Sequence, residues 1–108
     1  MNDISLEKLP PHDLKAEQAV LGSIIKNPES IVKVIDSLTS NVFYRGQHQK
    51  IYYAMTQLFR ANEPIDLLTL SDRLRKNEDL EAVGGTEYLS KLEESIPTST
   101  AISHYAAI

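Results

Sequence analysis

The sequence contains no cysteine and has few turn-forming residues, with four glycines and five prolines among its 108 residues. The absence of cysteine excludes disulfides and thiolate metal sites, and the scarcity of glycine and proline argues against a turn-rich β architecture. No apolar run approaches the ~18 residues of a membrane span, and no charged segment followed by an apolar one marks a secretion signal. With 42% apolar and 24% charged residues, we expect one globular domain, located in the cytoplasm, with no membrane partner.

Basic residues are also in short supply. Lysine and arginine number 11 against 15 acidic residues, which gives a net charge of −4. Proteins that bind nucleic acids on their own usually carry a basic patch and a high isoelectric point, whereas this chain has a pI of about 5.3. We therefore expect any role near DNA to run through contacts with other proteins.

The apolar residues recur with helical spacing, and no window alternates as a strand would. The clearest case is the set Ile31, Val34, Ile35 and Leu38, at i, i+3, i+4 and i+7. Capping and helix-breaking residues divide the chain into segments. We expect helices from an Asp13 cap to Asn27, from Pro28 onward, over about 47–61, from an Asp66 cap to about 76, over about 86–95 and from about 98 onward. Because the connections are short, these six short helices are expected to cross in a compact, all-α orthogonal bundle.

The two ends of the chain differ from its helical middle. Residues 1–11 are polar, unperiodic and closed by a Pro-Pro pair that favours extended backbone. We therefore expect a flexible N-terminal arm, followed by a helical domain over 12–108. At the other end, Ile102, Tyr105 and Ile108 open a new apolar face, which we expect to continue into a longer protein.

Motifs of catalysis and cofactor binding are absent from the sequence. A phosphate-binding loop, G-x-x-x-x-G-K-[ST], and a nucleophile elbow, G-x-S-x-G, are both missing. His12, His48 and His104 lie far apart, without the spacing of metal ligands. We assign no catalytic, cofactor-binding or metal-ligating residue and expect the chain itself not to be an enzyme.

Four sequence blocks carry a resemblance to a known family. They are PPHDLKAEQAVLG at 10–22, FYRGQHQKIYYAM at 43–55, PIDLLTL at 64–70 and GGTEYL at 84–89. In this order and spacing they resemble the N-terminal domain of bacterial replicative DNA helicases of the DnaB family. One departure is Ala101, where members commonly have asparagine, and it affects only where the last helix begins.

The resemblance implies a non-catalytic interaction domain of a hexameric helicase, contributing to ring assembly and primase docking at the replication fork. Its implied partners are the helicase-binding domain of primase, further copies of itself as a dimer or within a hexamer, and a helicase loader. The parent would be an ATP-dependent DNA helicase that continues into a helical hairpin, a linker and a motor domain. ATP and magnesium would bind in that motor domain, DNA would be contacted through it, and no cofactor would bind this part.

A small helix-turn-helix DNA-binding module is the alternative function. Short helices joined by a glycine-containing turn, as at 84–85, are compatible with it. The fifth expected helix, however, carries Glu87, Glu93 and Glu94 against Lys91 alone. A recognition helix would normally be basic, so the interaction domain is the favoured interpretation.

Tyr88 is the first candidate for a partner contact. Leu89, Leu92 and Ile96 define the inner stripe of the fifth expected helix, which leaves Tyr88 at the edge of that stripe. A tyrosine at such an edge presents an apolar ring with a polar tip, a type enriched at interface hot spots. Packing into the core is an equally good interpretation.

Arg73 and Lys76 are the next candidates. Together with Arg75 they form the only basic cluster in the sequence, at the end of the fourth expected helix. Cations at that end complement the negative pole of the helix dipole, which is the favoured interpretation. A docking patch for an acidic partner surface is the alternative.

Three residues of the matching blocks have simple structural interpretations. Glu17, in the first turn of the first helix, is explained by the helix dipole. Gly22, in mid-helix, costs roughly 1 kcal/mol relative to alanine, which indicates a close approach of another helix. His48 is interpreted as a structural histidine whose ring nitrogens bond the backbone or a neighbour, with a partner contact as the alternative.

Overall fold

The structure, a computed structural model, describes residues 13–96, and that part of the chain contains helices and no strand. The helices are α2 (Leu14–Lys26), η1 (Pro28–Lys33), η2 (Ser40–Val42), α3 (Gly46–Arg60), α4 (Leu67–Lys76), α5 (Leu80–Val83) and α6 (Gly85–Glu94), of which η1 and η2 are 3₁₀ helices. The expected all-α class is confirmed. The arm expected over 1–11 and the helix expected from about 98 lie outside the described residues.

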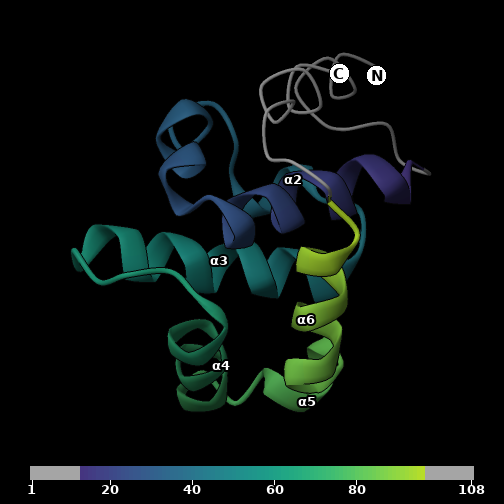
Figure 1. The fold of residues 1–108 in the computed structure, drawn as a ribbon, viewed down its shortest axis with the longest axis vertical. Coiled ribbons are helices and arrows are strands. Elements are labelled where there is room, and N and C mark those ends of the chain that lie inside the picture. Colours follow the sequence, from purple (N-terminus) through teal and green to yellow (C-terminus); the bar gives the residue numbers. More distant parts are fainter. Residues whose placement is uncertain (1–12, 97–108) are drawn as a thin grey trace.

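The helices cross one another around a shared core. In Figure 1, α3 runs through the middle of the molecule, with α2 on one side of it and α4 and α5 on the other. The ribbon of α6 runs across the directions of α2 and α3, as expected for an orthogonal bundle. The most extensive packing is between α2 and α6 and between α3 and α4. Within residues 13–96, no helix is long and apolar enough to cross a membrane.

The start of α2 and its packing on α6 follow the sequence rules. Asp13 caps the helix, because its Oδ1 accepts a hydrogen bond from the Ala16 amide at 2.9 Å. Gly22 lies where α6 passes closest, and a Cβ added there would press against the Leu92 carbonyl oxygen and lie 2.8 Å from Ile96 Cγ1. The expected close helix approach at Gly22 is therefore confirmed.

The helix expected after Pro28 is shorter and tighter than the pattern predicts. The 3₁₀ helix η1 ends at Lys33 and is followed by turns, with i+3 bonds such as Val34 N to Ile31 O and i+4 bonds such as Leu38 N to Val34 O. Ile31, Val34 and Leu38 are nevertheless buried. Apolar residues three and four apart suit a 3₁₀ turn as well as an α-helix, so the period alone could not separate the two.

In the second half of the described chain, the helix caps and the glycine turn lie where the sequence predicts them. Asp66 forms a capping box with Thr69, in which each side chain bonds the other residue's backbone N–H, at 2.8 and 2.9 Å. Gly84 and Gly85 have φ values of 108° and 74°, a left-handed conformation that glycine adopts at little cost. The four-residue helix α5 lies where only a turn was expected, and α6 begins at Gly85, one residue early.

Candidate partner-docking site

Glu17 lies in the first turn of α2 and points into the core, where it has no solvent exposure. Its Oε2 accepts a hydrogen bond from the Tyr44 amide, and its Oε1 lies against Nδ1 of His48, both at 2.6 Å. The helix dipole alone therefore does not explain this residue, contrary to the expectation. Glu17 joins α2 to the start of α3 through hydrogen bonds that replace the water it has lost.

His48 stands between two side chains from other helices. Its ring is fully buried, with Nδ1 on Glu17 and Nε2 at 2.7 Å from the hydroxyl oxygen of Tyr88. The interpretation as a structural histidine bonded to a neighbour is confirmed. We refer to these three residues, Glu17, His48 and Tyr88, as the buried hydrogen-bond chain.

The partners of His48 fix where its proton lies. Burial lowers the pKa of His48 below its ordinary value of 6.5, with Arg45 adding to the effect, although Glu17 acts in the opposite direction. The ring is therefore neutral at pH 7. We assign the hydrogen to Nδ1, which donates it to the carboxylate oxygen Oε1 of Glu17. The Nε2 atom is left as an acceptor for the Tyr88 hydroxyl.

Tyr88 is at once anchored and partly exposed. Its ring stacks on that of His48, with centroids 5.9 Å apart and planes at 19°. Its hydroxyl oxygen lies 3.3 Å from Nε2 of Gln18, which donates to it from α2. Tyr88 thus sits at the edge of the inner stripe, as expected, and it closes the corner where α2, α3 and α6 meet.

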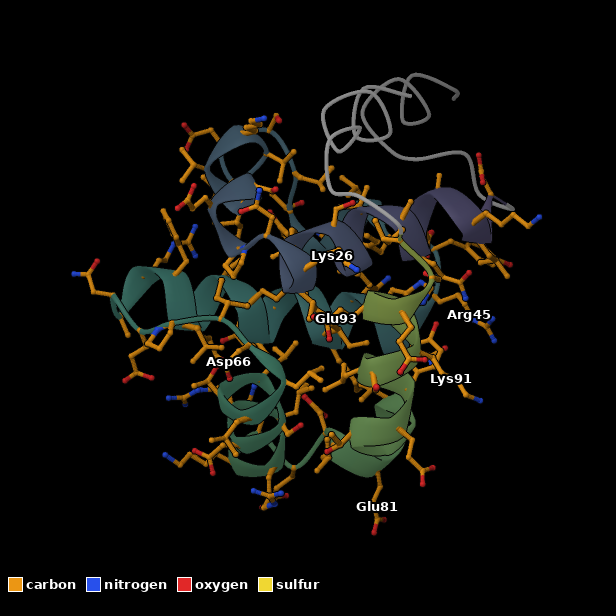
Figure 2. All side chains as sticks on the ribbon, in the orientation of Figure 1. Lys26, Arg45, Asp66, Glu81, Lys91 and Glu93 are labelled. Carbon is orange, nitrogen blue, oxygen red and sulfur yellow. The ribbon has the colours of Figure 1, made fainter. Side chains whose placement is uncertain are left out.

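The surface around this corner carries cations although the chain as a whole is acidic. Arg45 is exposed immediately before α3, and Lys91 is exposed on α6 one turn after Tyr88. In Figure 2 the two side chains lie on the same side of the molecule, beside α6. A partner group that approaches Tyr88 therefore meets an aromatic edge with two basic side chains nearby.

The basic cluster at the end of α4 is a separate feature. Arg75 and Lys76 both pair with Asp72, at 3.4 and 3.3 Å, and all three side chains are at least half exposed. Arg73 is partly buried, and its Nε has no hydrogen-bond partner among the described residues. Ion pairs as exposed as these contribute little, and here they mainly offset local charge.

The structure does not bring this cluster to Tyr88. At the end of α4, the Asn77 amide donates to Oε1 of Gln57 at 2.7 Å. Gln57 lies nine residues beyond His48 on α3, about 14 Å at ~1.5 Å per helical residue. Arg73 and Lys76 therefore belong to a different end of the molecule from Tyr88.

A shallow groove that runs from α4 to Thr86 of α6, and that the Asp72–Arg75 pair borders, was not foreseen. It is lined by Leu67, Leu68, Thr69, Ser71, Asp72, Arg75 and Thr86, and Leu68 is 79% exposed. The part of the chain that the structure describes holds no cluster of three or more potential metal ligands.

The polar atoms of Glu17 and His48 are all taken up by hydrogen bonds, to each other, to the Tyr44 amide and to the Tyr88 hydroxyl. The two residues therefore form a hydrogen-bonded pair rather than a metal centre.

The pairing of Glu17 with His48 was missed in the sequence, although a signal was present. Glu17 precedes Val20, Leu21 and Ile24 at i+3, i+4 and i+7, so it occupies the apolar stripe of its own helix. A carboxylate at such a position must find partners when it is buried. That spacing could have revealed its burial, but not the identity of its partner 31 residues away.

Known proteins resemble this chain along its whole length. Residues 9–108 match the family model described as DnaB-like helicase N terminal domain. The chain is 40% identical over 108 residues to the replicative DNA helicase DnaB of Geobacillus stearothermophilus, and 43% identical over 108 residues to the replicative DNA helicase DnaC of Bacillus subtilis (strain 168). Both alignments include 100% of this chain but only 24% of the relative, so the chain spans about a quarter of the length of these curated proteins.

Two solved structures have the same fold. The crystal structure of the N-terminal domain of DnaB helicase from Mycobacterium tuberculosis gives a TM-score of 0.86 at 37% identity, covering 91% of this chain and 68% of that one. The second is described as the structure of a DnaB-like replicative helicase and its interactions with primase. It gives a TM-score of 0.77 at 35% identity, covering 87% of this chain and 22% of that one.

Proposed function

The chain belongs to the family of DnaB-like helicase N-terminal domains, and on that premise we propose that it is the non-catalytic interaction domain of a hexameric replicative DNA helicase. It docks primase at the replication fork and contributes to assembly of the helicase ring. The observation that carries the docking role is the likeness, over 87% of this chain, to a DnaB-like helicase described with its interactions with primase.

In this proposal the chemistry belongs to the rest of the longer protein. Unwinding driven by ATP and magnesium, and the contacts with DNA, belong to a motor domain, and the whole protein acts in the cytoplasm. A helicase loader is a further partner of the assembled ring. The domain described above contributes surfaces, and its fold needs only to be stable and to present them in a fixed orientation.

Tethering explains how such a domain aids primer synthesis without catalysing it. A primase held on the helicase acts on the emerging single strand at an effective concentration set by the tether rather than by its free concentration. Several copies around a ring multiply the number of docking positions. Each copy needs only a modest affinity for primase, because rebinding to the same ring is fast.

Tyr88 is the proposed anchor of the docking surface. The buried hydrogen-bond chain holds its hydroxyl from behind, while part of the residue stays exposed. An aromatic side chain whose rotamer is already fixed loses little conformational entropy when a partner binds. Arg73 and Lys76 are secondary candidates, because Asp72 already offsets the charge of Lys76 and because they lie at another end of the molecule.

The test is the affinity of the chain for the helicase-binding domain of its own primase, by calorimetry. Tyr88→Ala is expected to weaken binding by about 30-fold, the effect of losing an anchor worth ~2 kcal/mol. Titrations are run well below the melting temperature of the variant, because the substitution also removes a partner of His48.

Tyr53→Ala is the matched control. Tyr53 is a tyrosine of α3 that is 51% exposed, whereas Tyr88 is held between α2 and α3 by Gln18 and His48. Its loss is expected to change the affinity less than about twofold, the range of a residue outside an interface core. Equal losses for Tyr88→Ala and Tyr53→Ala, or no loss for either, would refute Tyr88 as the anchor.

A further inference from the structure

The buried hydrogen-bond chain runs from the core to the surface through three helices. Glu17 comes from α2, His48 from α3 and Tyr88 from α6. The bond between Glu17 and His48 is fully buried, whereas the bond between His48 and Tyr88 is partly buried. A change in the inner pair is therefore passed to a side chain that a partner can reach.

The protonation state of His48 determines where the hydroxyl hydrogen of Tyr88 points. With the ring neutral and Nδ1–H donating to Glu17, Nε2 can only accept, and the Tyr88 O–H must point inward. The hydroxyl oxygen then faces Gln18, whose amide donates to it. If Nε2 carried a hydrogen instead, the Tyr88 oxygen would have to accept it, and its own O–H would turn outward toward that donor amide.

The groups around His48 favour the first arrangement at neutral pH. From α2 it faces Glu17, from the segment leading into α3 it faces Arg45, and from α6 it faces Tyr88. The ring of Phe43, before α3, meets the ring of His48 edge to face and brings no charge. Desolvation is the largest effect on the pKa of His48, and together with Arg45 it outweighs the opposite effect of Glu17.

We propose that Glu17 and His48 are positioning residues for primase docking, which hold the Tyr88 hydroxyl hydrogen inward so that the oxygen, which already accepts from Gln18, can also accept from a hydrogen-bond donor of the partner. This inference rests on the proposed function. The matching partner group is a neutral donor, such as an amide N–H or a hydroxyl, because the exposed Arg45 and Lys91 nearby would repel a lysine or an arginine. A carboxylate would find no donor at this oxygen.

Glu17→Gln provides a nearly isosteric test. The Tyr44 amide needs an acceptor and therefore takes the carbonyl oxygen of the new side chain, which turns its NH₂ toward His48. The Nδ1 atom must then accept, the hydrogen moves to Nε2, and the Tyr88 O–H is turned outward. The substitution thus reverses the hydrogen bonding at the surface without a change of pH.

The experiment has two readouts on the whole 108-residue chain. Nitrogen-15 NMR of the imidazole, without partner, is expected to find the Nδ1–H tautomer in the wild type and the Nε2–H tautomer in Glu17→Gln. Titration with the helicase-binding domain of primase at neutral pH is expected to find about fivefold weaker binding for Glu17→Gln, the size of one hydrogen bond.

A double-mutant cycle separates positioning from a general structural effect. In a Tyr88→Phe background, Glu17→Gln is expected to change the affinity by less than twofold, because no hydroxyl remains to be redirected. A fivefold loss that persists in Tyr88→Phe overturns the proposal, as does an Nε2–H tautomer in the wild type. Unchanged binding of Glu17→Gln after a confirmed tautomer change overturns it as well.

If Glu17→Gln does not fold, acid titration of the wild type replaces it. Affinity is expected to fall as the pH drops through the pKa of His48, and this dependence is expected to be absent in Tyr88→Phe. Parallel pH profiles of the two proteins overturn the positioning role. Failure of the wild type to bind primase at any pH overturns the proposed function too, whereas normal binding with the wrong response to Glu17→Gln overturns only this inference.

Discussion

At the scale of single residues, Tyr52 shows how one buried side chain secures an irregular part of the fold. It is fully buried on α3, and its hydroxyl donates to the Leu38 carbonyl at 2.9 Å. Its ring lies 5.3 Å from that of Phe43, centroid to centroid. The turns after η1 hold themselves together through local backbone bonds, and this contact with α3 helps to define their position on the core.

Tyr52→Phe is expected to lower the free energy of unfolding by about 1–2 kcal/mol, because the Leu38 carbonyl loses its donor while the ring stays in place. Chemical denaturation at pH 7 measures it. Tyr53→Phe, on the exposed side of the same helix, is the control and is expected to change stability by less than ~0.5 kcal/mol. A Tyr52→Phe variant as stable as the wild type would contradict this account of the turn.

The same residue predicts an alkaline limit to stability. Burial raises the pKa of Tyr52 from 10.0 to about 12. The folded state therefore holds its phenolic proton when the unfolded state has lost it, so this contribution is intact below pH 10 and is lost as the pH rises toward 12. The Tyr52→Phe protein is expected to lose less stability over that interval.

At the scale of elements, the crossing of α2 over α6 depends on the lack of a side chain at Gly22. Replacing glycine by alanine inside a helix normally stabilises it by up to ~1 kcal/mol. Here the new methyl group would press on the Leu92 carbonyl oxygen, which is backbone and cannot rotate away. The helices must separate instead, which loses packing along their whole contact.

Gly22→Ala is expected to lower the free energy of unfolding by about 1–3 kcal/mol, in the range of overpacked cores. Gly46→Ala is the matched control, because a Cβ at Gly46, the first residue of α3, meets nothing within 4 Å. That variant is expected to be neutral or slightly more stable. Thermal and denaturant unfolding of both proteins measure the change in stability. A Gly22→Ala variant as stable as the wild type would mean that α2 and α6 are not in close contact.

Elements defined by local chemistry could be predicted from the sequence, and those defined by distant contacts could not. Asp13 and Asp66 cap helices by accepting hydrogen bonds from backbone amides three positions away. Such caps can be recognised in a short stretch of sequence. The partners of His48 lie 31 and 40 residues away, where no local pattern reaches. The edge position of Tyr88 was predictable because it follows from its neighbours on α6, whereas its hydrogen bonds were not.

The short elements were the least predictable part of the fold. The helix α5 has four residues, too few for a periodic pattern, and its burial depends on Val83 packing against neighbours rather than on its own propensity. The tight turns of η1 were read as a regular helix for a related reason. In both cases tertiary packing decides the backbone, and the sequence records only that the residues are apolar.

At the scale of the whole molecule, the charge balance predicts weak binding to DNA. The net charge is −4, and Asp72 offsets part of the basic cluster on α4. We expect affinity for single- and double-stranded DNA weaker than the ~10⁻⁴–10⁻⁶ M of non-specific binders at physiological salt. Filter binding over a salt series measures it. Tighter binding with a steep salt dependence would favour the helix-turn-helix alternative.

The most direct test of the docking account is a map of the primase surface on this chain. Titrating the nitrogen-15-labelled protein with the helicase-binding domain of its primase, and following the backbone amides, locates contacts without any substitution. The account predicts the largest shifts at the corner of α2, α3 and α6, at Gln18, Arg45, Tyr88 and Lys91. Shifts confined to the α4 groove around Leu68, or no shifts at all, would contradict it.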